Sequence, residues 1–271
     1  MIRVRQLEPE DGQAATHLWA SAMKGSNYGE SLQKNIDKFV DMKLKDHNDM
    51  GNVYLNYVQM QKELSNDDKV QGGINFESNL RNANILQRRN FWVVDYIELS
   101  PEKHLKKSEI VGCIGGIVRS GNDLSKATPE GKDYIARDNF EYPLWSKPLG
   151  IGLSPNIYHG GVELVRMAVH SDFRGKEKIF SVVDAKSAFE SNEDQKVSVS
   201  QLLILSVAKW AVKMNCRYVV LTTGKSMYKA VGAYKRLGFS GHYLPENVAF
   251  SAEVSTLIDK NLPKNMYYEN I

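Results

Sequence analysis

The segment Val162–Lys176 constrains the fold most, because it reads as a buried strand that runs directly into a charged turn. Its first half, VELVRMAV, is apolar and rich in β-branched residues, which is typical of a strand. The turn ends in Arg174-Gly175-Lys176. Glycine lets backbone N–H groups approach an anion closely, and the two cations add charge. This pattern predicts a phosphate-binding loop at the end of the strand.

Strand and helix patterns alternate along the rest of the chain. Strands are expected at Ile2–Arg5, Phe91–Ile97, Glu109–Val118, Arg217–Thr223 and Phe239–Tyr243. Helices are expected from Pro9 to Ala22, over Ser198–Met214 and Ser226–Leu237, and more weakly around Ala252–Asp259. The sequence therefore predicts an α/β fold, with a mixed sheet and helices on both of its faces.

Residues 24–90 are polar and rich in Asn, Asp, Lys and Gln, and no clean linker bounds them. Two amphipathic helices are expected inside this stretch, around Ile36–Leu44 and Val53–Gln61. We interpret the stretch as an insertion, so that residues 1–271 form a single domain.

Composition limits the classes of partner. The 271 residues carry a formal charge of +3, which is too small to argue for nucleic acid or a membrane surface as a partner. No run of apolar residues reaches the ~18 that a membrane helix needs, and the N-terminus lacks the apolar core of a signal peptide. Cys113 and Cys216 stand in apolar stretches, which favours buried, reduced thiols. We expect a soluble, cytoplasmic protein.

Two side chains are candidates for proton transfer. Glu163 alternates with Arg166 across the strand, in line with apolar residues, where a carboxylate is costly to ionise and suits a general base. An exposed glutamate at a strand end is the alternative. Tyr234 shares a helix face with Ala230, and the alternative there is a tyrosine packed on the sheet with its hydroxyl at the edge. His159 and His170 flank the strand and are alternative bases, although a structural or exposed role is the simpler reading.

Two motifs in order resemble those of the GNAT superfamily of acetyl-CoA-dependent N-acyltransferases. Met167 to Lys176 matches the family's apolar-x-V-x-x-x-x-R-G-x-G as far as the lysine. Tyr234 to Phe239, Y-K-R-L-G-F, matches its closing Y-x-x-x-G-F. The chain is also loosely similar to the branch of amine and cysteine-conjugate acetyltransferases, without that branch's hydrophobic hairpin. The resemblance implies a mainly antiparallel central sheet with two insertions, at about 24–90 and 177–196.

The second glycine of the family's loop is missing, so the loop must be completed elsewhere. If residues 177–196 are an insertion, backbone N–H groups at the start of the next helix would complete it, and a helix N-terminus favours phosphate. Ser198 and Ser200 suit that helix start as caps. A side chain at Val197 or Val199 would crowd the phosphate, which is the weakness of this hypothesis.

The resemblance implies transfer of an acetyl group from acetyl-CoA to a primary amine on a small molecule or a protein, by direct attack and without a metal. It places the cofactor along the backbone of Met167, Ala168 and Val169, with its diphosphate on Arg174, Gly175, Lys176, Ser198 and Ser200. Glu163 would be the base and Tyr234 the acid for the thiolate.

Other functions remain open. Met227 stands where many family members have an asparagine, which favours the alternative of a non-catalytic acyl-CoA-binding or sensing module. A nucleotide P-loop is excluded, because no Gly-Lys-Ser/Thr follows the strand. The sequence identifies neither the acceptor amine nor the oligomeric state.

Overall fold

The structure is a computed structural model of the whole chain. It describes residues 1–25, 30–45, 50–59, 89–100, 104–119, 161–175, 177–183, 191–214, 216–243, 245 and 247–262. The chain divides into two compact units. Unit 1 comprises Met1–Gly116, Val165–Ser206 and Asn261–Ile271, and unit 2 comprises Ile117–Leu164 and Val207–Lys260.

The sheet of unit 1 has the strand order β6-β5-β1-β2-β3-β4. Its strands are β1 (Ile2–Gln6), β2 (Arg89–Leu99), β3 (Leu105–Arg119), β4 (Gly161–Val169), β5 (Phe180–Val183) and β6 (Ser191–Val197). The end of β3, from Ile117, and the start of β4, up to Leu164, belong to unit 2. β1 pairs antiparallel with β2, from Ile2 opposite Tyr96 to Gln6 opposite Trp92. β5 runs parallel to β1 and antiparallel to β6. Residues 177–196 therefore contain a hairpin that extends this sheet.

Helices and short helical turns precede β2 in the described residues of this stretch, which are 7–25, 30–45 and 50–59. They are η1 (Pro9–Asp11), α1 (Gly12–Lys24), α2 (Glu30–Lys45), η2 (Met50–Asn52) and the π-helical η3 (Leu55–Gln59). Pro9 suits the first turn of a helix, because its fixed φ is helical and no N–H is lost there. α1 and α2 pack on each other through apolar stripes, and the rings of Trp19 and Phe39 meet edge to face at 6.3 Å. The predicted helix around Ile36–Leu44 is thus confirmed as α2.

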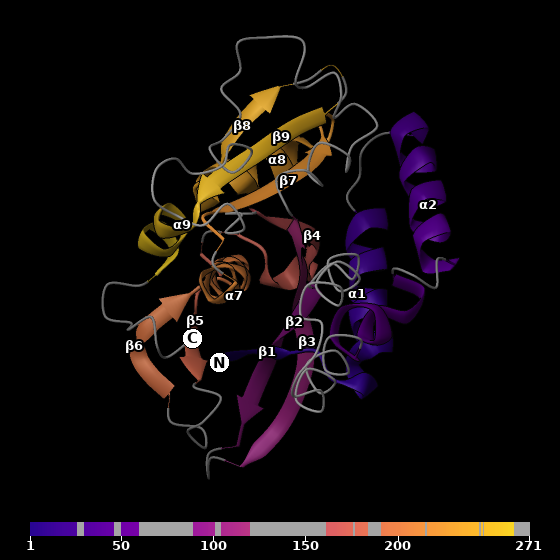
Figure 1. Cartoon of the computed structure of the whole chain (residues 1–271). Helices are drawn as coiled ribbons and strands as arrows, with labels where there is room; N and C mark the ends of the chain where they lie inside the picture. The colour runs from indigo at the N-terminus through magenta and orange to yellow at the C-terminus, as the bar shows by residue number, and fades with distance from the viewer. Residues whose placement is uncertain are drawn as a thin grey trace, which may run out of the picture. The chain divides into compact units, whose positions relative to one another are not determined.

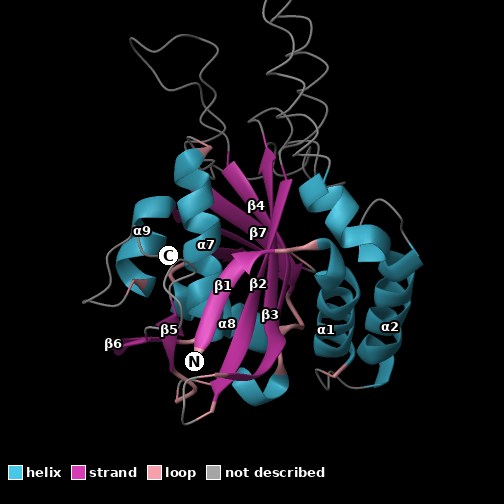
Figure 2. Cartoon of the chain, turned by 90° about the horizontal axis from the view of Figure 1, so that it is seen from below, coloured by secondary structure: helices cyan, strands magenta, loops and turns pink. Residues whose placement is uncertain are grey.

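Helices cover both faces of the unit 1 sheet, as Figure 2 shows for α1 and for the start of α7 (Val199–Lys213). The Cys113 thiol points to the Ala15 carbonyl of α1 at 3.9 Å. The neighbouring residue in β3, Gly112, faces the opposite way, and a methyl group there would lie 2.5 Å from Val199. α7 is apolar nearly all round from Leu202 to Leu205, which are fully buried, so it behaves as a core helix.

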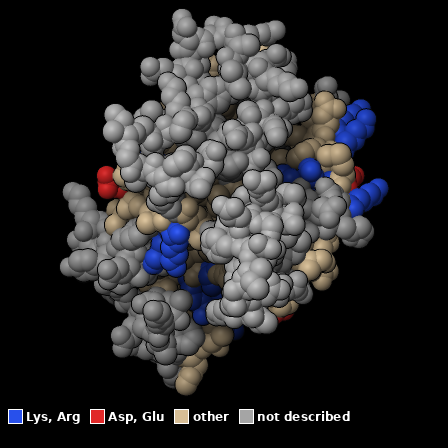
Figure 3. Space-filling model, in the orientation of Figure 1, with Lys and Arg blue, Asp and Glu red and all other residues tan. Residues whose placement is uncertain are grey.

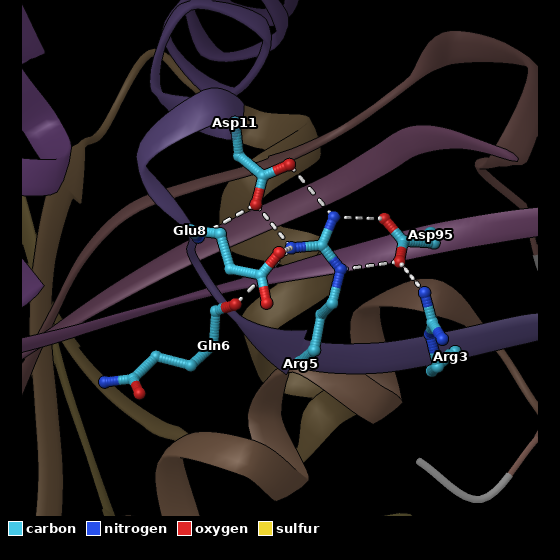
Figure 4. A network of polar contacts seen from close by, with 6 residues as sticks. All are labelled: Arg3, Arg5, Gln6, Glu8, Asp11 and Asp95. Carbon is cyan, nitrogen blue, oxygen red and sulfur yellow. Dashed lines mark hydrogen bonds and ion pairs between the residues drawn. The ribbon is translucent and has the colours of Figure 1, made fainter.

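A buried ion network ties β1 to β2 and η1 (Figure 4). The Arg5 guanidinium donates to both oxygens of Asp95, at 2.8 and 3.1 Å, and to both oxygens of Asp11. Arg3 adds a hydrogen bond of 3.0 Å to Asp95, whose side chain is only 1% exposed. Bidentate arginine–carboxylate pairs of this kind fix geometry as well as charge. The network therefore holds the start of α1 in register with the sheet.

Unit 2 has the strand order β4-β7-β9-β8, with β7 (Tyr218–Gly224), β8 (Ser240–Tyr243) and β9 (Asn247–Glu253). β7 is parallel to the start of β4 and antiparallel to β9, which is antiparallel to β8. α8 (Tyr228–Leu237) lies beside these strands in Figure 1, and α9 (Val254–Asn261) follows β9. α8 ends at Gly238, whose φ of 111° suits glycine.

The predicted fold class is confirmed: the sheets are mixed and mainly antiparallel, and helices flank them. The expected strands and helices appear with bounds that differ by a few residues, except the helix expected at Val53–Gln61. There the structure has the short π-helical η3, and the last two residues of the expected helix lie outside the described residues. β5, β6 and β9 were not predicted. The single domain stays a prediction. In the part of the chain that the structure describes, no helix is long and apolar enough to cross a membrane.

Candidate functional site

The central part of the candidate site in unit 1 is the end of β4. Met167 and Val169 are half-buried and Ala168 is buried. The hydrogen-bonded register of β4 with β7 runs from Gly161 to Glu163. Met167, Ala168 and Val169, the residues expected to bind the cofactor through their backbone, therefore come after the part of β4 that pairs with β7.

The Arg174 side chain turns back onto the strand. Its Nε donates a hydrogen bond of 2.7 Å to the Val169 carbonyl. The Arg174 amide donates to the Ser171 carbonyl at 3.2 Å, closing the short turn η5 (Ser171–Phe173). The carbonyl of Val169 and the amide of Arg174 therefore each have a hydrogen-bond partner within this chain. Binding of a cofactor by Met167–Val169 and by Arg174 stays a prediction.

Gly175 has the backbone conformation that the predicted phosphate loop needs. Its φ is 124°, in the region that side chains disfavour. A methyl group added to Gly175 would lie 2.6 Å from Glu177 Oε1, which shows that the Glu177 carboxylate lies directly against this glycine. An anion bound at this glycine would meet an exposed acidic side chain, a feature that the sequence analysis missed. Lys176, the third expected residue of the loop, lies outside the described residues.

The start of α7 carries a reciprocal cap. The Ser198 hydroxyl accepts from the Gln201 amide at 3.3 Å, and the Gln201 side chain accepts from the Ser198 amide at 3.0 Å. This is the capping box, here S-V-S-Q. Ser200 joins it through a hydroxyl contact of 3.2 Å with Ser198. The predicted cap at Ser198 is confirmed, while binding of a ligand by Ser198 and Ser200 stays a prediction.

The β5–β6 hairpin links the loop after β4 to this helix start. The ring of Phe180, the first residue of β5, lies 5.4 Å from the ring of Phe173 in the loop. On the other strand of the hairpin, Phe180 pairs with Val197, the residue before Ser198. Tyr96 of β2 packs on both rings, at 5.1 and 6.1 Å. The inserted residues therefore join the two expected halves of the phosphate site instead of separating them.

The two candidate proton-transfer residues both belong to unit 2. Glu163 is half-buried and stands opposite Val220 in the parallel pairing of β4 with β7. Tyr234 is half-buried on α8, and its ring packs on those of Phe239 and Phe250, at 5.8 and 5.5 Å. The packing that was the alternative for Tyr234 is thus present, and it fixes the direction of the ring. Neither contact tests the proposed roles.

His170 is exposed and its Nδ1 accepts from the Asp172 amide at 3.4 Å, while His159 lies outside the described residues. Met227 is the residue before α8, and its sulfur accepts a weak hydrogen bond of 3.5 Å from the Thr223 hydroxyl.

Cys113 and Cys216 are free and buried, and burial raises the pKa of the Cys113 thiol to about 12. Cys113 is therefore protonated at neutral pH and unsuited to nucleophilic attack.

Figure 3 shows that described lysine and arginine side chains reach the surface. Among the described residues, no three His, Cys, Asp or Glu side chains gather as a metal site would require.

Comparison with known proteins finds similarity only among solved structures. No family model matches. No curated protein matches either. One similar structure is the PaiA N-acetyltransferase from Thermoplasma acidophilum in complex with coenzyme A, at a TM-score of 0.46 and 11% identity, covering 93% of this chain and 99% of that one. FeeM, an N-acyl amino acid synthase from uncultured soil microbes, has a TM-score of 0.46 and 11% identity over 96% of this chain and 94% of its own.

A third similar structure is the spermidine N-acetyltransferase from Vibrio cholerae in complex with CoA and spermine. Its TM-score is 0.38 at 11% identity, over 95% of this chain and 98% of its own. All three TM-scores lie below 0.5, so the function rests on the chain's own residues.

Proposed function

We propose that this chain is an N-acetyltransferase that takes an acetyl group from acetyl-CoA and transfers it to a primary amine. One observation carries the proposal: the loop at Arg174 and Gly175 and the capped start of α7 are joined through Phe173, Phe180 and Val197. A glycine at positive φ and a helix N-terminus are the two backbone features that proteins use for phosphate. The same arrangement suits the diphosphate of coenzyme A.

The residues divide the work of binding. The Nη groups of Arg174 supply a fixed positive fork for phosphate, and the Gly175 amide approaches without the obstruction of a side chain. Ser198 and Ser200 stand at the positive end of the α7 dipole, which favours anions. The backbone of Met167, Ala168 and Val169 would align the thioester arm as an added strand, with the Val169 carbonyl kept by Arg174.

The chemistry asks for two proton transfers. Acetyl-CoA supplies the thioester carbonyl that the amine attacks; a C–N bond forms and the C–S bond breaks. Glu163 removes the proton that the ammonium must lose before it attacks, directly or through water. Tyr234 donates its phenolic proton to the thiolate that leaves. No covalent enzyme intermediate is needed, which agrees with the protonated, buried thiol of Cys113.

Isothermal titration with CoA tests the cofactor site. Arg174→Glu should weaken binding by about 10- to 100-fold, because it replaces a charge-assisted hydrogen bond of 1.5–3 kcal/mol with repulsion. Lys38→Glu, which reverses an exposed charge on α2, is the matched control and should bind as the unaltered chain does. If Arg174→Glu binds CoA as tightly as the unaltered chain, the proposed cofactor site is wrong.

Turnover separates the enzyme from the alternative. Release of free thiol from acetyl-CoA is measured against a panel of primary amines. Amine-dependent release is expected, and Glu163→Gln should lower it by about 10²- to 10⁴-fold and change its pH profile. CoA binding with no release for any amine would instead identify a non-catalytic acyl-CoA-binding module, the function that Met227 favours.

A further inference from the structure

Arg166 breaks the regular geometry of β4. Its φ is 54°, and among the described residues it is the only one besides glycine with a positive φ. A side chain with a β-carbon is disfavoured in this region, so neighbouring structure must hold it there. The Cys113 thiol contributes by donating to the Arg166 carbonyl at 3.6 Å. Such outliers cluster at ligand-binding positions, which makes this residue a candidate for function.

The break sends two consecutive side chains to one face of the sheet. Val165 lies next to Gly115, since a methyl group on that glycine would meet Val165 Cγ2 at 3.0 Å. Gly115 and Cys113 share a face of β3 by alternation, and the Cys113 thiol points to Ala15 of α1. The Arg166 side chain also reaches the α1 face. In a regular strand successive side chains alternate, so Arg166 would point to the face opposite that of Val165.

Two aromatic rings hold the guanidinium of Arg166 on that face. Its Cζ lies 5.3 Å from the ring centre of Trp19 and 5.8 Å from that of Phe39. The rings meet at 65°, so together they limit the guanidinium from two sides. Trp19 is only 2% exposed, whereas Arg166 and Phe39 are half-buried. A guanidinium on aromatic faces keeps its N–H donors at its edge, in a planar fork that matches a carboxylate.

The position along β4 indicates which ligand the fork would meet. On the proposed function, the diphosphate lies beyond the carboxyl end of β4, at Gly175. A cofactor arm that runs along Met167–Val169 then brings its acyl end toward Arg166, the preceding residue. On that arrangement the backbone of Arg166 would lie next to the acyl end of the arm, which makes its fork a candidate contact for the acceptor.

We propose that Arg166 binds a carboxylate of the acceptor, so that the preferred substrate is an amine that also carries a carboxylate. This rests on the proposed function for the role of the bound molecule, but the carboxylate preference is measurable without turnover. Arg166 acts as a specificity residue: its fork would orient the acceptor, and the amine would be left to react.

The test uses matched pairs of probes that differ only in the carboxylate: L-leucine and L-leucinamide, L-lysine and L-lysinamide, β-alanine and β-alaninamide. Each is titrated calorimetrically into the protein, with and without saturating CoA. For at least one pair the acid should bind about 10-fold more tightly than the amide. Arg166→Gln should abolish this preference while the affinity for the amide stays within about 2-fold. Arg166→Lys should retain part of it.

Arg89→Gln is the control, because Arg89 also stacks on an aromatic ring, that of Tyr57 at 5.6 Å. It should keep the carboxylate preference. Thermal melting of each variant separates loss of folding from loss of recognition, and Arg166→Lys provides a second variant that preserves charge.

The outcomes of the two proposals are distinct. CoA binding with no preference for any acid over its amide overturns the role of Arg166 and leaves the proposed function standing. Equal losses for acid and amide in Arg166→Gln also overturn it, since that is the mark of a structural residue. If CoA fails to bind, the proposed function falls, and the titrations without CoA still decide whether Arg166 recognises a carboxylate.

Discussion

Phe173 and Phe180 pack ring against ring, with centroids 5.4 Å apart and an interplanar angle of 34°. Phe173 closes the turn after β4, and Phe180 opens the β5–β6 hairpin. This contact holds the turn before Arg174 against the β5–β6 hairpin. On the proposed function, this packing would take the place of the loop's missing second glycine in holding the turn, and it comes from residues that look like an interruption in the sequence.

Truncation of this contact should loosen the phosphate loop. Phe180→Ala is expected to weaken CoA binding by about 10-fold and to lower the free energy of unfolding by roughly 1–3 kcal/mol, less than the 3–5 kcal/mol of a fully buried phenylalanine because Phe180 is half-buried. Calorimetric titration and urea unfolding measure the two effects. Phe180→Tyr, which keeps the ring, should leave CoA affinity and the free energy of unfolding close to those of the unaltered chain. Tyr228→Ala, at an exposed tyrosine, should change neither quantity.

Removal of the charge on Glu177 should tighten CoA binding. Its carboxylate lies against Gly175, where the diphosphate would approach. Glu177→Gln is expected to lower the Kd by about 3- to 10-fold, and the gain should shrink as salt screens the repulsion. Titrations at low and high ionic strength check this, with the exposed Glu10→Gln as the control. An unchanged Kd at low salt would mean that the phosphates bind elsewhere.

Tyr234→Phe separates chemistry from binding. The phenyl ring can keep its contacts with Phe239 and Phe250, so folding and CoA affinity should be unchanged. Loss of the phenolic proton should lower kcat by about 10²- to 10⁴-fold, the usual range for a general acid. Steady-state thiol release and the Kd for CoA are measured on the same preparation. A kcat within about 2-fold of the unaltered chain would remove Tyr234 from the mechanism.

Asp95 should be the most sensitive position of the network in Figure 4. It accepts from Arg3 and from two atoms of Arg5 while its side chain is 1% exposed. Asp95→Ala leaves the Arg5 guanidinium without one of its two carboxylates, and removal of one partner from a buried pair costs about 3–5 kcal/mol. Urea unfolding at pH 7 gives the value, and Glu98→Ala at an exposed carboxylate on the same strand is the control. A loss below about 1 kcal/mol would contradict this account.

Asp11 should make the stability depend on acid. Burial pushes the pKa of its carboxyl up, but hydrogen bonds from Arg5 and from the Glu8 amide outweigh burial and hold it below the ordinary value. A depressed folded-state pKa contributes stability that is complete above about pH 4, the ordinary Asp value, and is lost as the pH falls through the folded-state pKa. Asp11→Asn should therefore flatten the fall in unfolding free energy below about pH 4, measured by urea titration from pH 6 to pH 2.5. Parallel curves for the two proteins would exclude Asp11 as a source.

The sequence predicts what depends on local pattern. The apolar strand before Arg174 becomes β4, the stripe of the 198–214 segment becomes the buried α7, and Ser198 caps it as expected. β9 was within reach, because Val248, Phe250 and Ala252 alternate with more exposed residues along it. Its pattern is short and contains alanine and serine, which makes the signal weak.

The remainder depends on contacts between distant residues. Arg5 and Asp95 are 90 positions apart, so their pairing follows from the register of β1 on β2 and not from either segment alone. Phe180 reads as an ordinary apolar residue until β5 pairs with β1. Arg166 reads as one step in a regular alternation, and only the positive φ shows that its side chain faces α1. Such features arise from tertiary packing that sequence patterns do not encode.

Gly112 has no functional group, yet it sets how closely α7 can approach the sheet. Because Val199 occupies the space that a side chain at position 112 would need, the first turn of α7 lies directly on the backbone of β3. Any larger residue there would lift that turn by a few tenths of an ångström or more, together with its N–H groups. The affinity for an anion at this helix could thus be tuned from a position that never touches the ligand, by the size of one side chain.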